Sequence, residues 1–197
     1  MKNTKVWRDW MLPFLVVSAA YIFAFVITIY GLLPLQAAYT PDLEKYASLL
    51  FLPHGVRVLS AWLLGWRSIP LIAPAALYTH FLNFGADGFT VLGSAGAMSS
   101  VVGATLCFWL LAKFGMDFRI STGRNVHWRD VMLAGFFASI VNTVGMGYVY
   151  HHSYKTMTSY LIGDVSGLFA CMFVLMLVFK MLRGLQATKL PSCLLTY

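Results

Sequence analysis

Seven polar or ionisable side chains lie within or beside long apolar runs of the sequence, and their types suit ligand binding or proton chemistry. They are His54, Arg57, His80, Asn83, Asn142, Tyr148 and Asp164. Asp164 is the one acid, and Arg57 the one base, deep inside such a run. Because an unpaired charge there is costly, we expect these two residues to pair, directly or through water. The pair would either fix helix register or line a polar cavity.

The sequence lacks the common patterns of enzymes and cofactor sites. It has no hydrolytic triad, no HExxH motif and no glycine-rich loop followed by Lys-Ser/Thr. Its three cysteines, Cys107, Cys171 and Cys193, form no CxxC pair, so neither a disulfide framework nor a zinc site is expected. His54 and His80 could face each other as haem ligands do, but this is the less favoured interpretation. We therefore expect no metal, no cofactor and no enzymatic activity.

The composition identifies the solvent that surrounds these residues. Hydrophobic residues make up 59% of the chain and charged residues 11%, against about 25% charged in soluble domains. The mean hydropathy is +0.74. So much apolar surface indicates a multi-pass protein of a lipid bilayer. The net charge of +7 fits basic loops beside a membrane, and we expect no nucleic-acid binding.

The apolar runs predict an all-α fold, a bundle of six transmembrane helices. A spanning helix needs about 20 mostly apolar residues. The run that begins at residue 11 is too long for the apolar region of a signal peptide, so we interpret it as the first span. The expected spans are 11–34, 48–66, 68–84, 89–114, 130–150 and 157–182.

The basic residues predict how the six spans are oriented. With an even number of spans, eleven of the 14 Lys and Arg residues fall on one side and two, Lys45 and Lys155, on the other, while Arg57 lies within a span. The basic side is the cytoplasmic one, so we expect residues 1–10 and 183–197 in the cytoplasm. This topology puts all seven polar residues in the outer half of the bundle.

Small residues at helical spacing predict close helix packing. Gly96, Ser100 and Gly103 lie on the fourth span, and Gly163 and Gly167 form a GxxxG motif on the sixth. Such patterns let helix backbones approach closely in lipid. They are common in membrane proteins and therefore indicate packing and not a function.

Several short segments, taken in order, resemble a known family. They are LPHGVRVL at 52–59, LLGWR at 63–67 with Pro70, Arg129-Asp130-Val131, and LIGDVSGL at 161–168. Over roughly residues 50–182 the chain resembles the first class of bacterial MASE domains, which are membrane-associated sensors. The resemblance implies the sensory membrane part of a histidine kinase or diguanylate cyclase, with a mostly undefined ligand. The chain differs in having His54 and Arg57 where that family tends to have small or apolar residues.

The tail after Arg183 is too short for a kinase or cyclase domain, so a stand-alone sensor-like subunit is expected. It would lie in a bacterial inner membrane and bind a small ligand, or a partner membrane protein, through its outer half. One alternative is the substrate-binding or accessory part of a transporter, such as the six-helix subunit of a vitamin importer. Another is a non-catalytic scaffold in a larger membrane complex. An enclosed outer cavity would favour the sensor and the transporter over the scaffold.

Overall fold

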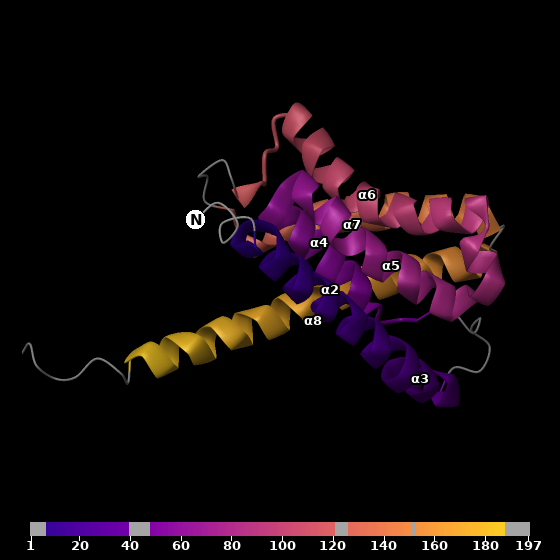
Figure 1. Ribbon diagram of the computed structural model, residues 1–197, viewed down its shortest axis with the longest axis horizontal. Helices are drawn as coiled ribbons and strands as arrows, with labels where there is room; N and C mark the ends of the chain where they lie inside the picture. Colours follow the sequence, from indigo (N-terminus) through magenta and orange to yellow (C-terminus); the bar gives the residue numbers. More distant parts are fainter. Residues whose placement is uncertain (1–6, 40–47, 121–125, 151–152, 188–197) are drawn as a thin grey trace, which may run out of the picture.

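The computed structural model describes residues 7–39, 48–120, 126–150 and 153–187, and every regular element in these ranges is a helix (Figure 1). In chain order the elements are η1 (Trp7–Met11), α2 (Leu12–Val26), η2 (Ile27–Leu32), α3 (Leu33–Tyr39), α4 (Leu52–Leu64), η3 (Gly65–Arg67), α5 (Ser68–Phe84), η4 (Gly85–Phe89), α6 (Val91–Lys113), α7 (Trp128–Tyr150) and α8 (Tyr154–Ala187). In the described ranges, five helical stretches are long and apolar enough to cross a membrane.

Four of these five stretches correspond to the predicted first, fourth, fifth and sixth spans. The first is a single helical run from Trp7 to Tyr39 that includes two π-helical segments, η1 and η2. It therefore extends beyond both ends of the predicted span at 11–34. Helix α8, which is 34 residues long, likewise extends beyond the predicted 157–182 at both ends.

The remaining stretch, Leu52–Phe84, is the second along the chain and contains both the second and the third predicted spans. It breaks at Gly65, whose φ of +57° is a backbone conformation that side-chain-bearing residues rarely adopt. The chain turns back at this break, so that α5 returns along α4 (Figure 1). Arg57 of α4 and His80 of α5 therefore line one cavity. The stretch is thus a helical hairpin, and it counts as one of the five candidate membrane-crossing stretches.

The region of the second predicted span begins with a non-helical segment. Residues 48–51 are not helical, and α4 starts only at Leu52, with Pro53 in its first turn. Proline is well tolerated there because the first N–H groups of a helix have no partner within it. The predicted second span, 48–66, thus includes four non-helical residues before α4 begins.

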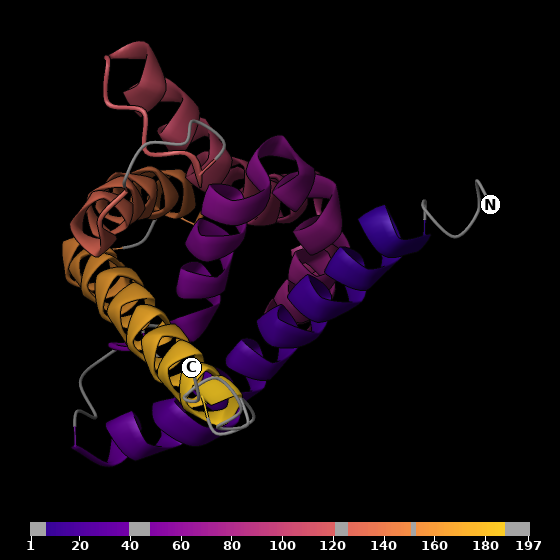
Figure 2. The same cartoon turned by 90° about the vertical axis from the view of Figure 1, so that its left-hand side faces the viewer.

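Helix α4 is the centre of the bundle and contacts α2, α5, α6, α7 and α8 (Figure 2). The pairs α6–α7, α4–α8, α7–α8, α2–α5 and α5–α6 also pack together. Two side-chain bonds link neighbouring helices here. The Ser18 hydroxyl donates to the Leu71 carbonyl at 3.0 Å, and the hydroxyls of Ser68 and Thr105 lie 3.0 Å apart.

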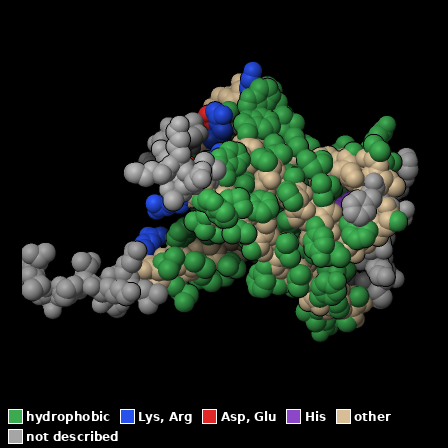
Figure 3. Space-filling model, in the orientation of Figure 1, with side chains coloured by type: hydrophobic (Ala, Val, Ile, Leu, Met, Phe, Trp, Pro, Cys, Tyr) green, Lys and Arg blue, Asp and Glu red, His purple; other side chains and the backbone are tan. Residues whose placement is uncertain are grey.

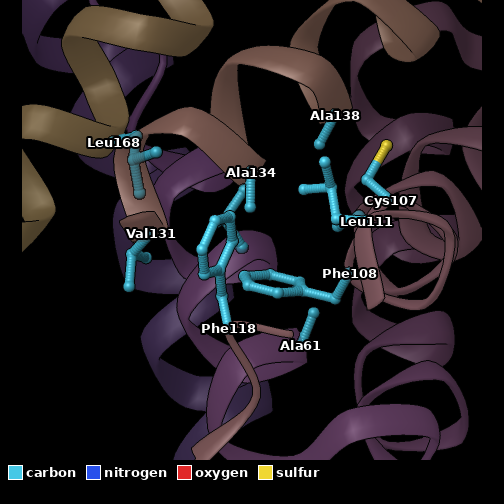
Figure 4. Close-up of a cluster of buried hydrophobic side chains, with 11 residues drawn as sticks. Ala61, Cys107, Phe108, Leu111, Phe118, Val131, Ala134, Ala138 and Leu168 are labelled. Carbon is cyan, nitrogen blue, oxygen red and sulfur yellow. The ribbon is translucent and has the colours of Figure 1, made fainter. Parts of the chain in front are cut away.

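One half of the bundle is filled by apolar side chains (Figure 4). Phe108 of α6, Val131 and Ala134 of α7 and Leu168 of α8 are almost completely buried there. Phe118, which follows α6 in a non-helical segment, packs into the same cluster and is 7% exposed. Among the described residues, this half has no set of buried charged groups like that described below, which is why it can pack as an ordinary core.

The surface is largely apolar and its basic side chains are gathered (Figure 3). Many large hydrophobic side chains are exposed, among them Phe23, Phe169 and Val174. In the view of Figure 3, Lys and Arg appear toward the left and the top, where η1 begins and where α6 and α8 end (Figure 1). An apolar surface with its basic residues toward one side fits a multi-pass membrane protein.

Candidate functional site

Asp164 is the centre of a buried polar cluster between α7 and α8. Its side chain is 2% exposed. Its Oδ2 accepts a 2.8 Å hydrogen bond from the Asn142 amide and a 3.2 Å bond from the Ser139 hydroxyl. Ser139 and Asn142 are three residues apart on α7, so both face α8. These two donors stabilise the carboxylate in a place where water would otherwise be needed.

His54 of α4 completes this cluster. Its Nε2 lies 3.2 Å from the Gly135 carbonyl oxygen, and since a carbonyl only accepts, Nε2 carries the proton. Its Nδ1 lies 3.3 Å from Asp164 Oδ2 but makes no well-aligned hydrogen bond. If the ring is neutral, Nδ1 presents a lone pair to the carboxylate. One further proton shared by the two groups would convert this contact into a charge-assisted hydrogen bond.

Arg57 does not pair directly with Asp164, and this corrects the expected direct contact. In the described ranges, the ion pairs within 4.0 Å join His54 to Asp164, Arg119 to Asp117 and His127 to Asp130. The Oδ2 atom of Asp164 instead accepts its hydrogen bonds from Ser139 and Asn142 of α7. A pairing through water stays a prediction.

The Arg57 side chain is buried without an acceptor among the described residues. The residue is 3% exposed, its Nε has no hydrogen-bond partner, and its guanidinium carbon lies 5.6 Å from the centre of the Phe51 ring. The aromatic face supplies a favourable but modest electrostatic contact to the cation. The guanidinium thus keeps most of its donors for another group.

Arg57 and Asp164 both line one cavity between all of the major helices. About 90 Å³ of this cavity is open to the centre of a water molecule, several times the space that one water needs. Its wall combines aromatic, aliphatic and polar side chains. The lining residues are Tyr21, Phe25, Ile29, Ser48, Phe51, Arg57, Ala76, Thr79, His80, Asn83, Phe84, Ala97, Ser100, Asn142, Met146, Tyr160 and Asp164.

The structure brings six of the seven predicted polar residues together. Five line the cavity, namely Arg57, His80, Asn83, Asn142 and Asp164. His54 lies behind Asp164 and contacts it. Tyr148 is separate from this group, because it is 80% exposed and does not line the cavity.

The predicted packing residues have three different roles. Gly103 lies close to α7, since a Cβ on it would be 3.2 Å from Val141 Cγ1. Gly163 and Gly167 instead pack against the backbone of the non-helical segment 48–51. Ser100 lines the cavity, and its hydroxyl donates to the Ala97 carbonyl. Gly96 is buried in α6.

The glycine pair of α8 allows backbone to pack against backbone. A Cβ on Gly163 would overlap the Ser48 carbonyl oxygen, and one on Gly167 would overlap that of Phe51. The Phe51 N–H donates to the Gly163 carbonyl at 2.8 Å, and the Ser166 hydroxyl donates to the Leu49 carbonyl at 2.5 Å. These bonds satisfy polar backbone groups that a non-helical segment exposes inside a bundle.

Sequence reasoning missed Ser139, the aromatic wall and this non-helical segment. Ser139 could have been found, because it precedes Asn142 by one helical turn. Tyr21 and Phe25 are also one turn apart on α2, but nothing distinguishes them from lipid-facing residues in the sequence. Their position in the cavity wall follows from how α2 packs against α5.

The cluster does not resemble a metal centre. No group of three or more His, Cys, Asp or Glu side chains that could hold a metal ion occurs in the described part of the chain. What the arrangement can do is bind polar groups inside an apolar wall and hold a proton between His54 and Asp164. Comparison of the chain with family models, curated proteins and solved structures gives no match.

Proposed function

We propose that this protein is a sensor-like membrane subunit that receives a small molecule in the cavity lined by Arg57 and Asp164. The observation that carries the proposal is a buried arginine, without an acceptor among the described residues, that faces this cavity. A buried charge without a partner is costly, and such residues in membrane proteins usually mark a ligand or ion site. The resemblance to bacterial membrane sensors, which rests on short motifs, gives the proposal its signalling aspect.

The same observation supports a second candidate, the substrate-binding component of a transporter. Either function needs a ligand cavity reached from one side of the membrane, so the cavity favours both over a scaffold without a ligand. Association with another membrane protein belongs to both proposals. A partner that is an ATPase would identify transport, and a signalling enzyme would identify a sensor.

The ligand proposal predicts that small molecules leave with the protein when it is extracted gently. Native mass spectrometry of the unmodified protein should show a bound species that is lost from a Ser100→Phe variant, since Ser100 lines the cavity and a phenyl ring would fill it. Val91→Phe is the matched control, because Val91 on the same helix is 90% exposed. Equal occupancy in all three proteins would contradict a ligand in this cavity.

A six-crossing topology with both termini in the cytoplasm is part of the proposal. Helix α4 alone, with 13 residues, is only about 20 Å long, less than a hydrocarbon core of about 30 Å. Residues 48–51, which precede α4, and η3, which follows it, form the rest of this crossing in the proposed topology. The end of the hairpin at Phe84 and the end of α6 at Lys113 then lie on opposite sides of the membrane.

Cysteine labelling tests this topology. In a background without the native cysteines, Ala86→Cys should react with a membrane-impermeant maleimide added to intact cells, and Met116→Cys should react only after lysis. Both positions are exposed and lie just outside opposite ends of α6. The opposite pattern would reverse the orientation, and labelling of both from one side would contradict a crossing by α6.

A further inference from the structure

Two opposite charges line the cavity without contacting each other, and this arrangement limits the ligands that fit. Arg57 and Asp164 both face the cavity, and no ion pair within 4.0 Å joins them. A ligand with only a negative charge would lie near the Asp164 carboxylate, and one with only a positive charge would lie near Arg57. Neither kind of ligand satisfies both groups.

The hydrogen bonds of Asp164 leave one of its oxygens available. Both donors from α7 and the closest approach of His54 are at Oδ2. In the described ranges Oδ1 makes no hydrogen bond, and it is not among the atoms that are both fully buried and unpartnered. Oδ1 is therefore the oxygen that faces the cavity and can accept a bond from a ligand.

Arg57 offers the complementary group. A guanidinium presents parallel N–H donors that match the two oxygens of a carboxylate. Asn83, which also lines the cavity, offers an amide that can donate to the same ligand group. The aromatic rings of Phe25, Phe51 and Phe84 form part of the wall, and ring faces attract an ammonium group.

Resting on the proposed function, we infer that the ligand is a small zwitterion of the amino-acid or betaine type. Its carboxylate binds the Arg57 guanidinium, and its ammonium group lies against Asp164 Oδ1 and the aromatic wall. Each buried charge of the protein then gains an opposite charge, and no net charge enters the bundle. The aliphatic part of the wall, which includes Ile29, Ala76 and Met146, leaves room for a small apolar side chain.

The test compares ligands that differ by one charge, using the full chain in lipid nanodiscs. Thermal unfolding is followed with glycine, L-alanine, L-leucine and glycine betaine, and then with two leucine analogues. L-Leucinamide lacks the carboxylate, and 4-methylpentanoate lacks the ammonium group. A ligand that binds only the folded state raises the Tm in a concentration-dependent way. We expect at least one zwitterion to do so, and L-leucinamide and 4-methylpentanoate to require at least tenfold higher concentration than L-leucine.

Two variants assign each charge to its residue. In Arg57→Gln, L-leucine should no longer raise the Tm at lower concentration than L-leucinamide, which lacks the carboxylate. In Asp164→Asn, L-leucine should no longer raise the Tm at lower concentration than 4-methylpentanoate, which lacks the ammonium group. Arg129→Gln is the matched control, because Arg129 is exposed at the start of α7 and away from the cavity. Arg57→Lys keeps the charge but not the paired donors, so it should retain part of the affinity for the zwitterion. It replaces Arg57→Gln in the comparison if Arg57→Gln does not fold.

Three results would overturn the inference. Equal stabilisation by the neutral 4-methylpentanamide in wild type and Arg57→Gln would show a purely apolar site, which leaves the proposed function standing. An Arg57-dependent Tm that changes with phosphatidylglycerol content and not with any zwitterion would assign the site to a lipid phosphate. A lack of response to all four zwitterions would reject the class, while the native mass spectrometry above decides separately whether the cavity holds a ligand.

Discussion

Asp164→Ala is expected to cause a large loss of stability. The change removes the acceptor of the bonds from Asn142 and Ser139 and the charge beside His54. These partners are buried, and the Ser139 hydroxyl keeps only the Leu161 carbonyl, 3.5 Å away, as an acceptor. Removing one member of a buried charged network costs about 3–5 kcal/mol in soluble proteins, and access of water from the cavity would reduce this. Purified yield and Tm should both fall.

The size of the effect is checked by thermal unfolding in one detergent, with Asp117→Ala as the control. Asp117 is also an acid with an ion-pair partner, Arg119, but that pair lies outside the helices and is partly exposed. Exposed pairs contribute little, so Asp117→Ala should change the Tm only slightly. The hydrogen bond to Asp117 raises the pKa of Arg119. An arginine is charged at physiological pH with or without such a bond, so Asp117→Ala leaves the charge of Arg119 unchanged. Equal losses in the two variants would contradict the buried-network interpretation.

Double-mutant cycles identify the partner of Asp164. The structure predicts a coupling energy of about 0.5–3 kcal/mol between Asp164→Ala and Asn142→Ala, since the two side chains share a hydrogen bond. Coupling between Asp164 and Arg57 should be smaller, because no contact joins them. A larger coupling with Arg57 than with Asn142 would restore the pairing that the sequence suggested.

Much of the fold could be predicted because lipid makes helix length and apolarity informative. The apolar runs locate the long helices, and the depth of each polar residue follows from the order of the spans. Depth alone therefore groups Arg57, His80, Asn83, Asn142 and Asp164, and these five residues do line one cavity. Tyr148 has a similar predicted depth in the membrane, but it lies on a face of α7 that points away from the bundle.

The pairing within the site could not be predicted, because sequence gives depth but not the direction of a side chain. Arg57 and Asp164 are the two opposite charges, so charge alone favours their contact. The structure gives Asp164 neutral donors from α7 and places His54 beside it, three residues before Arg57 on the same helix. Which of these two α4 residues contacts Asp164 depends on the start of α4, and Pro53 and the segment before it determine that start.

Gly167→Ala is expected to cause the second large loss of stability, because Gly167 packs against the segment that precedes α4. The added Cβ would overlap the Phe51 carbonyl oxygen, and Gly163→Ala would do the same at the Ser48 carbonyl. The obstacle in each case is backbone held by hydrogen bonds and not the end of a flexible side chain, so the segment 48–51 must move away from α8. Overpacking of a tight interior costs typically about 1–3 kcal/mol.

Gly184→Ala provides a matched control on the same helix, because nothing lies within 4 Å of the Cβ that it would add. Alanine favours a helix over glycine by about 1 kcal/mol, so Gly184→Ala should leave the Tm unchanged or raise it. Gly167→Ala gains the same helix propensity, and a fall in its Tm therefore reports the backbone contact. Because Phe51 and Arg57 line the cavity, the displaced segment should also weaken ligand retention in native mass spectrometry. A Tm for Gly167→Ala equal to that of Gly184→Ala would show that α8 does not hold the segment in this position.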